Sequence, residues 1–216
     1  MATRQRTPDA QAGPTIANRL LAGGTSGNEL LTSVTGAVLI ALLAVIGITI
    51  LRLRSLLWVH LFVGLVLLGP LVLKMASTGY RFLRYYTRDP AYVRKGAPPT
   101  TLRLIAPIVV FTTVIVMASG VALLIGGPQS RGTFLPIHKA SFFIWAVFTS
   151  VHVLGHLPEL ARGMREEYGA QARLGEAQRG RAGRSLALAS ALTLGAVTAV
   201  LCAPAFGAWV NAPLHH

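Results

Sequence analysis

The sequence has little of what a disulfide, a cysteine-bound metal cluster or an acid–base active site would need. Cys202 is the single cysteine among 216 residues, which excludes a disulfide within the chain and a metal cluster held by cysteines. Asp and Glu together number only 7. No carboxylate pair, nucleophile–base arrangement or phosphate-binding loop appears in the sequence. A catalytic centre built from the chain's own side chains is therefore not indicated.

Charged residues are scarce, whereas apolar runs are long. Hydrophobic residues make up 53% of the chain and charged residues 12%, and the mean hydropathy is +0.57. This composition is typical of an integral membrane protein. Five runs are long enough to cross a bilayer, and they cover residues 30–51, 56–78, 104–126, 135–157 and 186–209. We expect an all-α integral membrane protein with five transmembrane helices, the first a retained span rather than a signal peptide.

The net charge of +13 does not indicate nucleic-acid binding, because the cations lie between the apolar runs. The N-terminal tail and the segments after runs two and four hold fifteen Arg and Lys residues, and the opposite side holds three. The positive-inside rule then predicts a cytoplasmic N-terminus and an extracytoplasmic C-terminus. We expect a multi-pass protein of a bacterial-type inner (plasma) membrane, in contact with lipid.

The positions of the apolar runs and the predicted orientation divide the chain into four predicted segments. Residues 1–28 form a basic cytoplasmic tail, and residues 29–160 form a four-helix membrane bundle. Residues 161–185 form a charged cytoplasmic linker, into which the fourth helix extends before the chain turns. Residues 186–216 form the fifth helix and an outer tail.

The fourth run carries three histidines, His138, His152 and His156. An ionisable side chain inside a membrane span by default marks a functional site. On a helix, His138 and His152 fall within about 40° of each other and stand about 21 Å apart. The predicted topology makes runs two and four parallel, and His60 lies about four residues into run two, at the depth of His138. Two imidazoles at one depth on two helices of a bundle suit bis-histidine ligation of one haem iron, whose natural role is electron transfer.

Other residues at that depth can support a haem. Gly47 and Gly120 would let the porphyrin approach the backbone, and Arg54 and Arg131 at the outer edge could pair with its propionates. Each residue also has an ordinary interpretation. The glycines suit close helix packing, the arginines suit solvated loops, and His60 and His138 could be hydrogen-bonded core histidines.

The inner half has no matched histidine pair. Lys74 lies fourteen residues after His60, at the depth of His152, and Met75 is its neighbour. A lysine near a helix end ordinarily extends to the interface. Three possibilities stay open for His152, His156 and Lys74: a second haem with unusual ligation, a quinone contact, or a polar group without a cofactor.

The histidine spacing and the glycines resemble those of the membrane cytochrome b superfamily. Its members include the cytochrome subunits of nickel–iron hydrogenases and formate dehydrogenases and the haem subunits serving periplasmic molybdenum enzymes. The resemblance covers residues 30–160 and implies that the first four helices bind haem b. It also implies electron transfer between the quinone pool and a partner oxidoreductase, which the outer depth of the haem would place on the extracytoplasmic side. Two-haem members have two histidines on each of two helices, and here Lys74 stands in place of the fourth.

Two other functions remain as hypotheses. The chain could be a haem-free accessory or assembly subunit of a membrane complex. It could also be a small transporter that moves protons or ions past Lys74, His152 and His156, although carboxylates are lacking within its spans and Glu159 lies only at an edge.

Overall fold

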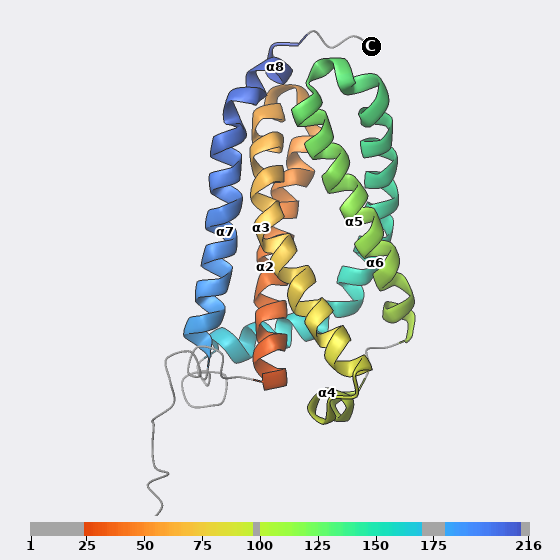
Figure 1. Cartoon of the computed structure of the whole chain (residues 1–216), viewed down its shortest axis with the longest axis vertical. Coiled ribbons are helices and arrows are strands. Elements are labelled where there is room, and N and C mark those ends of the chain that lie inside the picture. Colours follow the sequence, from red (N-terminus) through yellow and green to blue (C-terminus); the bar gives the residue numbers. More distant parts are fainter. Residues whose placement is uncertain (1–23, 97–99, 170–179, 213–216) are drawn as a thin grey trace, which may run out of the picture.

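The computed structural model describes residues 24–96, 100–169 and 180–212, and within these ranges no strand occurs. Five long helices dominate the fold (Figure 1): α2 (Gly24–Leu51), α3 (Leu53–Tyr86), α5 (Thr100–Gly126), α6 (Arg131–Tyr168) and α7 (Arg181–Cys202). The short helices are α4 (Pro90–Lys95), η1 (Pro128–Ser130), η4 (Ala203–Ala205) and α8 (Phe206–Val210). The predicted all-α class is confirmed, since all five long helices are apolar enough to cross a membrane.

The helices form two hairpins. Helix α2 packs against α3, and α5 packs against α6. The hairpins meet where α2 contacts α6 and, less extensively, where α3 contacts α5. Helices α3 and α6 therefore face each other diagonally across a four-helix arrangement. The end that holds the α2–α3 and α5–α6 turns and α8 is called the outer end here, following the predicted orientation.

The two turns at the outer end are short. Arg52 alone separates α2 from α3, and Leu56 has non-helical backbone angles inside the first turns of α3. Gly127 ends α5 with φ 68°, a left-handed conformation that suits glycine. Phe206 is fully buried beneath this end and meets Trp58 edge-on at 5.7 Å between ring centroids. Phe206 also belongs to a buried apolar cluster with Leu65 of α3 and Leu123 and Leu124 of α5, so α8 packs against both hairpins at the outer end.

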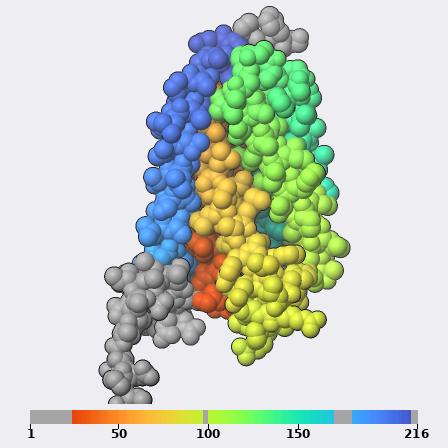
Figure 2. All heavy atoms as spheres, viewed as in Figure 1, coloured from red at the N-terminus to blue at the C-terminus, as the bar shows by residue number. Residues whose placement is uncertain are grey.

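Helix α7 lies outside the four-helix arrangement, alongside α3 (Figures 1 and 2). Its contact with α3 is a backbone-to-backbone approach. A Cβ atom added to Gly69 would overlap the carbonyl oxygen of Ala191, and one added to Gly195 would overlap that of Val66. Small residues of this kind let membrane helices come close enough for dispersion contacts along their length. The fifth helix is therefore a brace on α3, the helix that carries His60 and Lys74.

The last part of α6 crosses the inner end of the bundle instead of continuing straight (Figure 1). Pro158 lies inside α6, and an internal proline removes a backbone hydrogen bond and bends a helix. Beyond it, Gly163 sits against Ser33 of α2, where a Cβ atom would come within 2.6 Å of the Ser33 hydroxyl oxygen. The predicted extension of the fourth helix is present, but it lies across the bundle. Much of the predicted linker 161–185 is helical, since α6 runs to Tyr168 and α7 begins at Arg181; residues 170–179, like most of the 1–28 tail, lie outside the described ranges.

A buried ion pair joins the end of α6 to the start of α7. The Arg184 guanidinium donates to the Glu167 carboxylate at 2.6 Å, and the two side chains are 9% and 2% exposed. Arg181 adds a longer contact of 3.7 Å to the same carboxylate. Removing one partner of a buried pair leaves the other charge uncompensated.

We expect Glu167→Gln to lower the free energy of unfolding by about 3–5 kcal/mol, the usual cost of breaking such a pair. Thermal unfolding of the detergent-solubilised protein measures this loss. Glu166→Gln is the matched control, because Glu166 is the exposed neighbour on the same turn. Equal melting temperatures for the two variants would show that the Glu167–Arg184 pair does not hold α7 in place.

Candidate functional site

His60 of α3 is held by a hydroxyl group of the neighbouring helix. Its Nδ1 atom lies 2.9 Å from Thr49 Oγ1 of α2, and the Thr49 hydroxyl lies 2.6 Å from the Ile46 carbonyl oxygen. A carbonyl can only accept, so the single hydroxyl proton of Thr49 is donated to Ile46. Thr49 must then accept from His60, and Nδ1 carries the proton. The network therefore leaves the lone pair of His60 on Nε2.

His138 of α6 is held in the same way from α5. Its Nδ1 atom lies 3.0 Å from the Val116 carbonyl oxygen and 3.1 Å from Ser119 Oγ. Because the carbonyl must accept, Nδ1 again carries the proton and Nε2 has the lone pair. Gly120 makes room for the ring, since a Cβ atom there would lie 3.1 Å from His138 Cε1. The role that the structure gives Gly120 is thus to seat the imidazole.

The two histidines are presented from diagonally opposed helices at the outer end. Each is hydrogen-bonded to the helix that is its partner in a hairpin. A neutral imidazole with one nitrogen hydrogen-bonded to the protein and the other free is the form that binds a metal. The described residues contain no cluster of three or more His, Cys, Asp or Glu suited to a bare ion. A metal at this site would have to bring further ligands with it, as a porphyrin does.

Gly47 and Gly36 lie on one stripe of α2, because eleven residues on a helix return to within about 20°. At the inner depth Gly36 is closely approached, with a Cβ atom there 3.1 Å from Lys74 Nζ. At the outer depth a Cβ atom on Gly47 would meet nothing within 4 Å. Gly47 is exposed in this structure, so the neighbouring helices leave the stripe uncovered at the depth of the His60–His138 pair, whereas Lys74 occupies it at the inner depth.

The two arginines assigned to propionates lie at the outer end. Arg54 is exposed in the first turn of α3. The Arg131 guanidinium lies 5.3 Å from the centre of the Trp209 ring of α8, a cation–π distance. Arg131 is therefore engaged with α8 in this structure, and its pairing with a propionate stays a prediction, as does that of Arg54.

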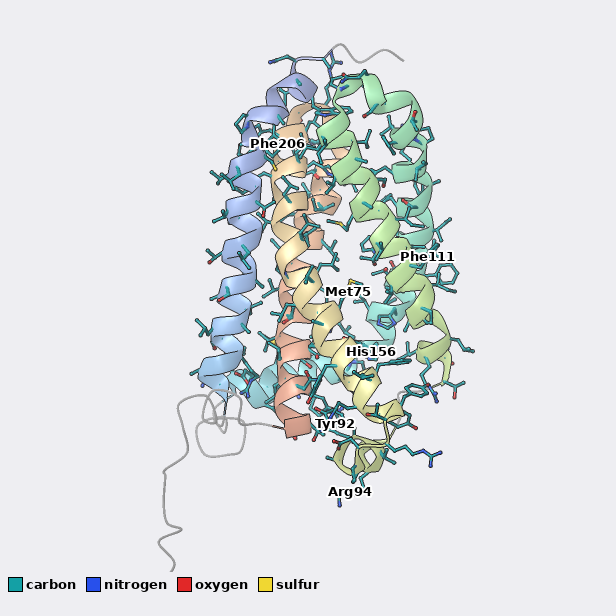
Figure 3. The ribbon with its side chains drawn as sticks, viewed as in Figure 1. Met75, Tyr92, Arg94, Phe111, His156 and Phe206 are labelled. Atoms are coloured by element: carbon teal, nitrogen blue, oxygen red, sulfur yellow. The ribbon has the colours of Figure 1, made fainter. Side chains whose placement is uncertain are left out.

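Lys74 does not extend to the interface, contrary to the ordinary behaviour of a lysine near a helix end. Its ammonium donates to the Thr32 carbonyl oxygen of α2 at 2.7 Å, and Gly36 leaves the space for it. The reason is local: Gly36 has no side chain, so the ammonium reaches the Thr32 carbonyl oxygen one turn earlier on α2. Lys74 thus bridges α2 and α3 in the inner half, and its neighbour Met75 lies there too (Figure 3).

Three polar residues of α6 form a line in the inner half. The rings of His152 and His156 meet edge-on at 4.6 Å between centroids, and His156 Nδ1 lies 2.8 Å from Glu159 Oε2 (Figure 3). His152 Nδ1 is buried without a hydrogen-bond partner among the described residues. The His152 imidazole therefore has a buried nitrogen to which a bound group could hydrogen-bond.

Sequence reasoning did not identify Thr49, Val116 and Ser119, which orient the two outer histidines. A usable signal was present for two of them, because Thr49 and Ser119 are hydroxyl residues within helix spans at the depth of His60 and His138. Depth alone does not say which way a side chain faces, so the pairing required the structure. Searches of protein-family models, of curated proteins and of solved structures found no match to this chain.

Proposed function

We propose that the chain is a membrane-embedded b-type cytochrome subunit with one haem in the outer half of the α2–α6 bundle. His60 and His138 would hold its iron through Nε2. The observation that carries the proposal is the shared tautomer: each Nδ1 is fixed by an acceptor on the adjacent helix, and each Nε2 lone pair is left for iron. A histidine that serves only as a hydrogen-bonded core residue would not require Nδ1 to be the bonded nitrogen in both rings.

A bis-histidine haem supplies reversible one-electron transfer without an open iron position. The chain's own residues do the positioning. Thr49 and Val116 hold the imidazole planes and increase the basicity of Nε2, because a hydrogen bond from Nδ1–H to an acceptor strengthens the ligand. Gly47 and Gly120 would supply space, and Phe206 is fully buried beside Trp58 at this end.

Electrons would pass between membrane quinone and a partner oxidoreductase subunit that docks at the outer, extracytoplasmic end. The inner line of His152, His156 and Glu159 with Lys74 provides donors and a titratable path suited to a quinone headgroup. A second haem there is less favoured, because the Lys74 ammonium is already committed to the Thr32 carbonyl.

A transporter is the second candidate, and the same line of polar residues supports it. Glu159 lies half exposed at the inner end and joins His156, which touches His152. The line stops near Lys74, and at the outer depth the polar groups of His60 and His138 bind neighbouring helices instead of continuing it. If the chain were a haem-free accessory subunit, the tautomer shared by His60 and His138 would have no functional reason.

The hydroxyl of Thr49 gives a specific test of the haem site. Thr49→Val keeps the side-chain shape but removes the acceptor for His60 Nδ1–H. We expect haem affinity to fall about 10–100-fold, the usual effect of losing the hydrogen-bond partner of a ligand, with the low-spin spectrum retained at saturating haem. Haem titration of the purified apoprotein measures the change.

Thr198→Val is the matched control, because the Thr198 hydroxyl is exposed on α7 and bonds only the Leu194 carbonyl of its own helix. Equal haem affinity in the two variants would contradict a ligand role for His60.

A further inference from the structure

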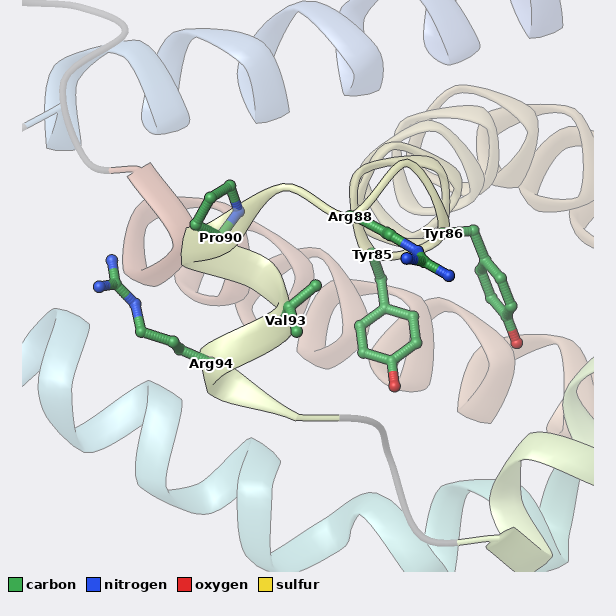
Figure 4. A pocket seen from close by; sticks show the side chains of 6 residues that line it. All are labelled: Tyr85, Tyr86, Arg88, Pro90, Val93 and Arg94. Atoms are coloured by element: carbon green, nitrogen blue, oxygen red, sulfur yellow. The ribbon is translucent and has the colours of Figure 1, made fainter.

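A second site lies at the other end of the molecule, in the corner between α3 and α4. Six residues line an open hollow of about 700 Å³ (Figure 4), and they define the α3–α4 pocket: Tyr85, Tyr86, Arg88, Pro90, Val93 and Arg94. It is remote from the outer histidine pair, since it lies beyond the inner end of α3.

Local sequence fixes the shape of this corner. Arg88 adopts φ 59°, an uncommon left-handed conformation for a residue other than glycine, and it reverses the chain. Asp89 then caps α4 by accepting from the Ala91 backbone N–H at 2.9 Å, and it pairs with Arg84 of α3. Tyr92 is buried against Tyr80 at 6.0 Å between ring centroids. The α3–α4 pocket is therefore built by several contacts and is not a loose loop.

Its charge is not neutralised by the protein. The cations around it have anionic partners: Arg81 and Lys95 pair with Glu29, and Arg84 pairs with Asp89. Arg88 and Arg94 are exposed and form no side-chain ion pair or hydrogen bond with another described residue. Figure 4 shows Arg88 alongside the rings of Tyr85 and Tyr86, with Arg94 at the opposite edge on α4. The Tyr86 hydroxyl is already held by Arg103 at 3.0 Å.

The α3–α4 pocket lies at the level expected for the membrane–water interface. It follows the apolar part of α3 by about two turns, at the level where tyrosines gather at a membrane–water interface. Phe82 and Leu83, one turn nearer the bilayer, are 63% and 59% exposed. A ligand here would meet guanidinium groups and aromatic walls at one level and apolar side chains just below.

We propose that the α3–α4 pocket binds the headgroup of one anionic phospholipid. Arg88, beside the tyrosine rings, binds the phosphate, since a guanidinium fork matches phosphate oxygens, and Arg94 adds positive charge from the opposite edge (Figure 4). Tyr85 and Val93 flank the glycerol, and the acyl chains run along Phe82 and Leu83. A free phosphate ion would use the arginines but not the exposed apolar side chains beside them. Anionic lipid attracts basic segments at the inner surface, and this pocket makes that attraction site-specific.

The test uses the full-length protein in detergent, titrated with short-chain phosphatidylglycerol or phosphatidylcholine and followed by native mass spectrometry. We expect one phosphatidylglycerol per chain to bind in preference to phosphatidylcholine. The double variant Arg88→Gln/Arg94→Gln should weaken it about tenfold or more, as loss of charge-assisted hydrogen bonds to phosphate implies. The matched control Arg162→Gln/Arg165→Gln removes two exposed charges of α6 at the same end and should change affinity less than twofold.

Three results would overturn the proposal. Equal losses in the pocket variant and in Arg162→Gln/Arg165→Gln would show that only overall charge matters. Equal binding of phosphatidylglycerol and phosphatidylcholine would show that the pocket does not recognise the headgroup. Displacement of the lipid by millimolar inorganic phosphate would identify a site for free anions. Haem content does not enter the measurement, so its outcome is independent of the proposed cytochrome function.

Discussion

His138→Ala is expected to abolish the haem spectrum of the purified protein, and His60→Ala is expected to do the same. Each substitution removes one of the two proposed iron ligands, and the groups hydrogen-bonded to these imidazoles, Thr49, Ser119 and the Val116 carbonyl, are oxygen atoms that do not replace an imidazole nitrogen. The measurement is the reduced-minus-oxidised absorption spectrum after haem-replete expression, normalised to protein. A full low-spin spectrum in either variant would mean that the ligand pair is wrong.

Two inner-half variants act as controls for this experiment. Lys74→Ala and His152→Ala alter polar residues of the same two helices at the other depth. With a single outer haem, both should keep the full haem content of the unmodified protein. Loss of half the haem in either variant would indicate a second, inner haem and would correct the assignment of the inner half to a quinone contact.

Gly69→Ala or Gly195→Ala is expected to separate α7 from α3 and to destabilise the protein. In each case the new methyl group would overlap a backbone carbonyl of the opposing helix, and a backbone atom cannot rotate away as a side chain can. Overpacking commonly costs about 1–3 kcal/mol, occasionally more, and here the helices must also lose dispersion contacts as they move apart. Thermal unfolding in detergent should show a clear decrease in stability.

Gly64→Ala is the matched control on the same helix, because a Cβ atom at Gly64 meets nothing within 4 Å. This substitution should leave the melting temperature unchanged or slightly raised. If Gly69→Ala and Gly195→Ala melt like Gly64→Ala, then α7 is not a brace on α3.

The sequence was sufficient to predict the five helices, because apolar runs of spanning length leave few alternatives in a membrane. The helix ends were less accurate. Helix α3 continues to Tyr86, well past the predicted end at residue 78, since a helix does not have to stop where its apolar run stops. The crossing of α6 beneath the bundle was not predicted either, because the presence of Pro158 indicates a bend but not its direction.

In the candidate site, likewise, the sequence predicts the depth of a residue but not the direction in which its side chain points. Residue spacing placed His60 and His138 at one depth, and the structure puts both at the outer end. The rotation of each helix, and so the contact of Thr49 with His60 or of Gly120 with His138, depends on packing between helices that no single-chain pattern encodes. Lys74 illustrates the limit: its depth matched that of His152, but its bond to the Thr32 carbonyl depends on the proximity of α2.

The absorption spectrum of the unmodified, full-length protein tests the central claim most directly. Membranes from haem-replete cells provide the protein, which is purified and reduced with dithionite. The account predicts the sharp α-band of a low-spin b haem at one haem per chain, accompanied by the electron paramagnetic resonance signal of a bis-histidine ferric haem. A folded, monodisperse protein that shows neither signal and takes up no added haem would contradict it.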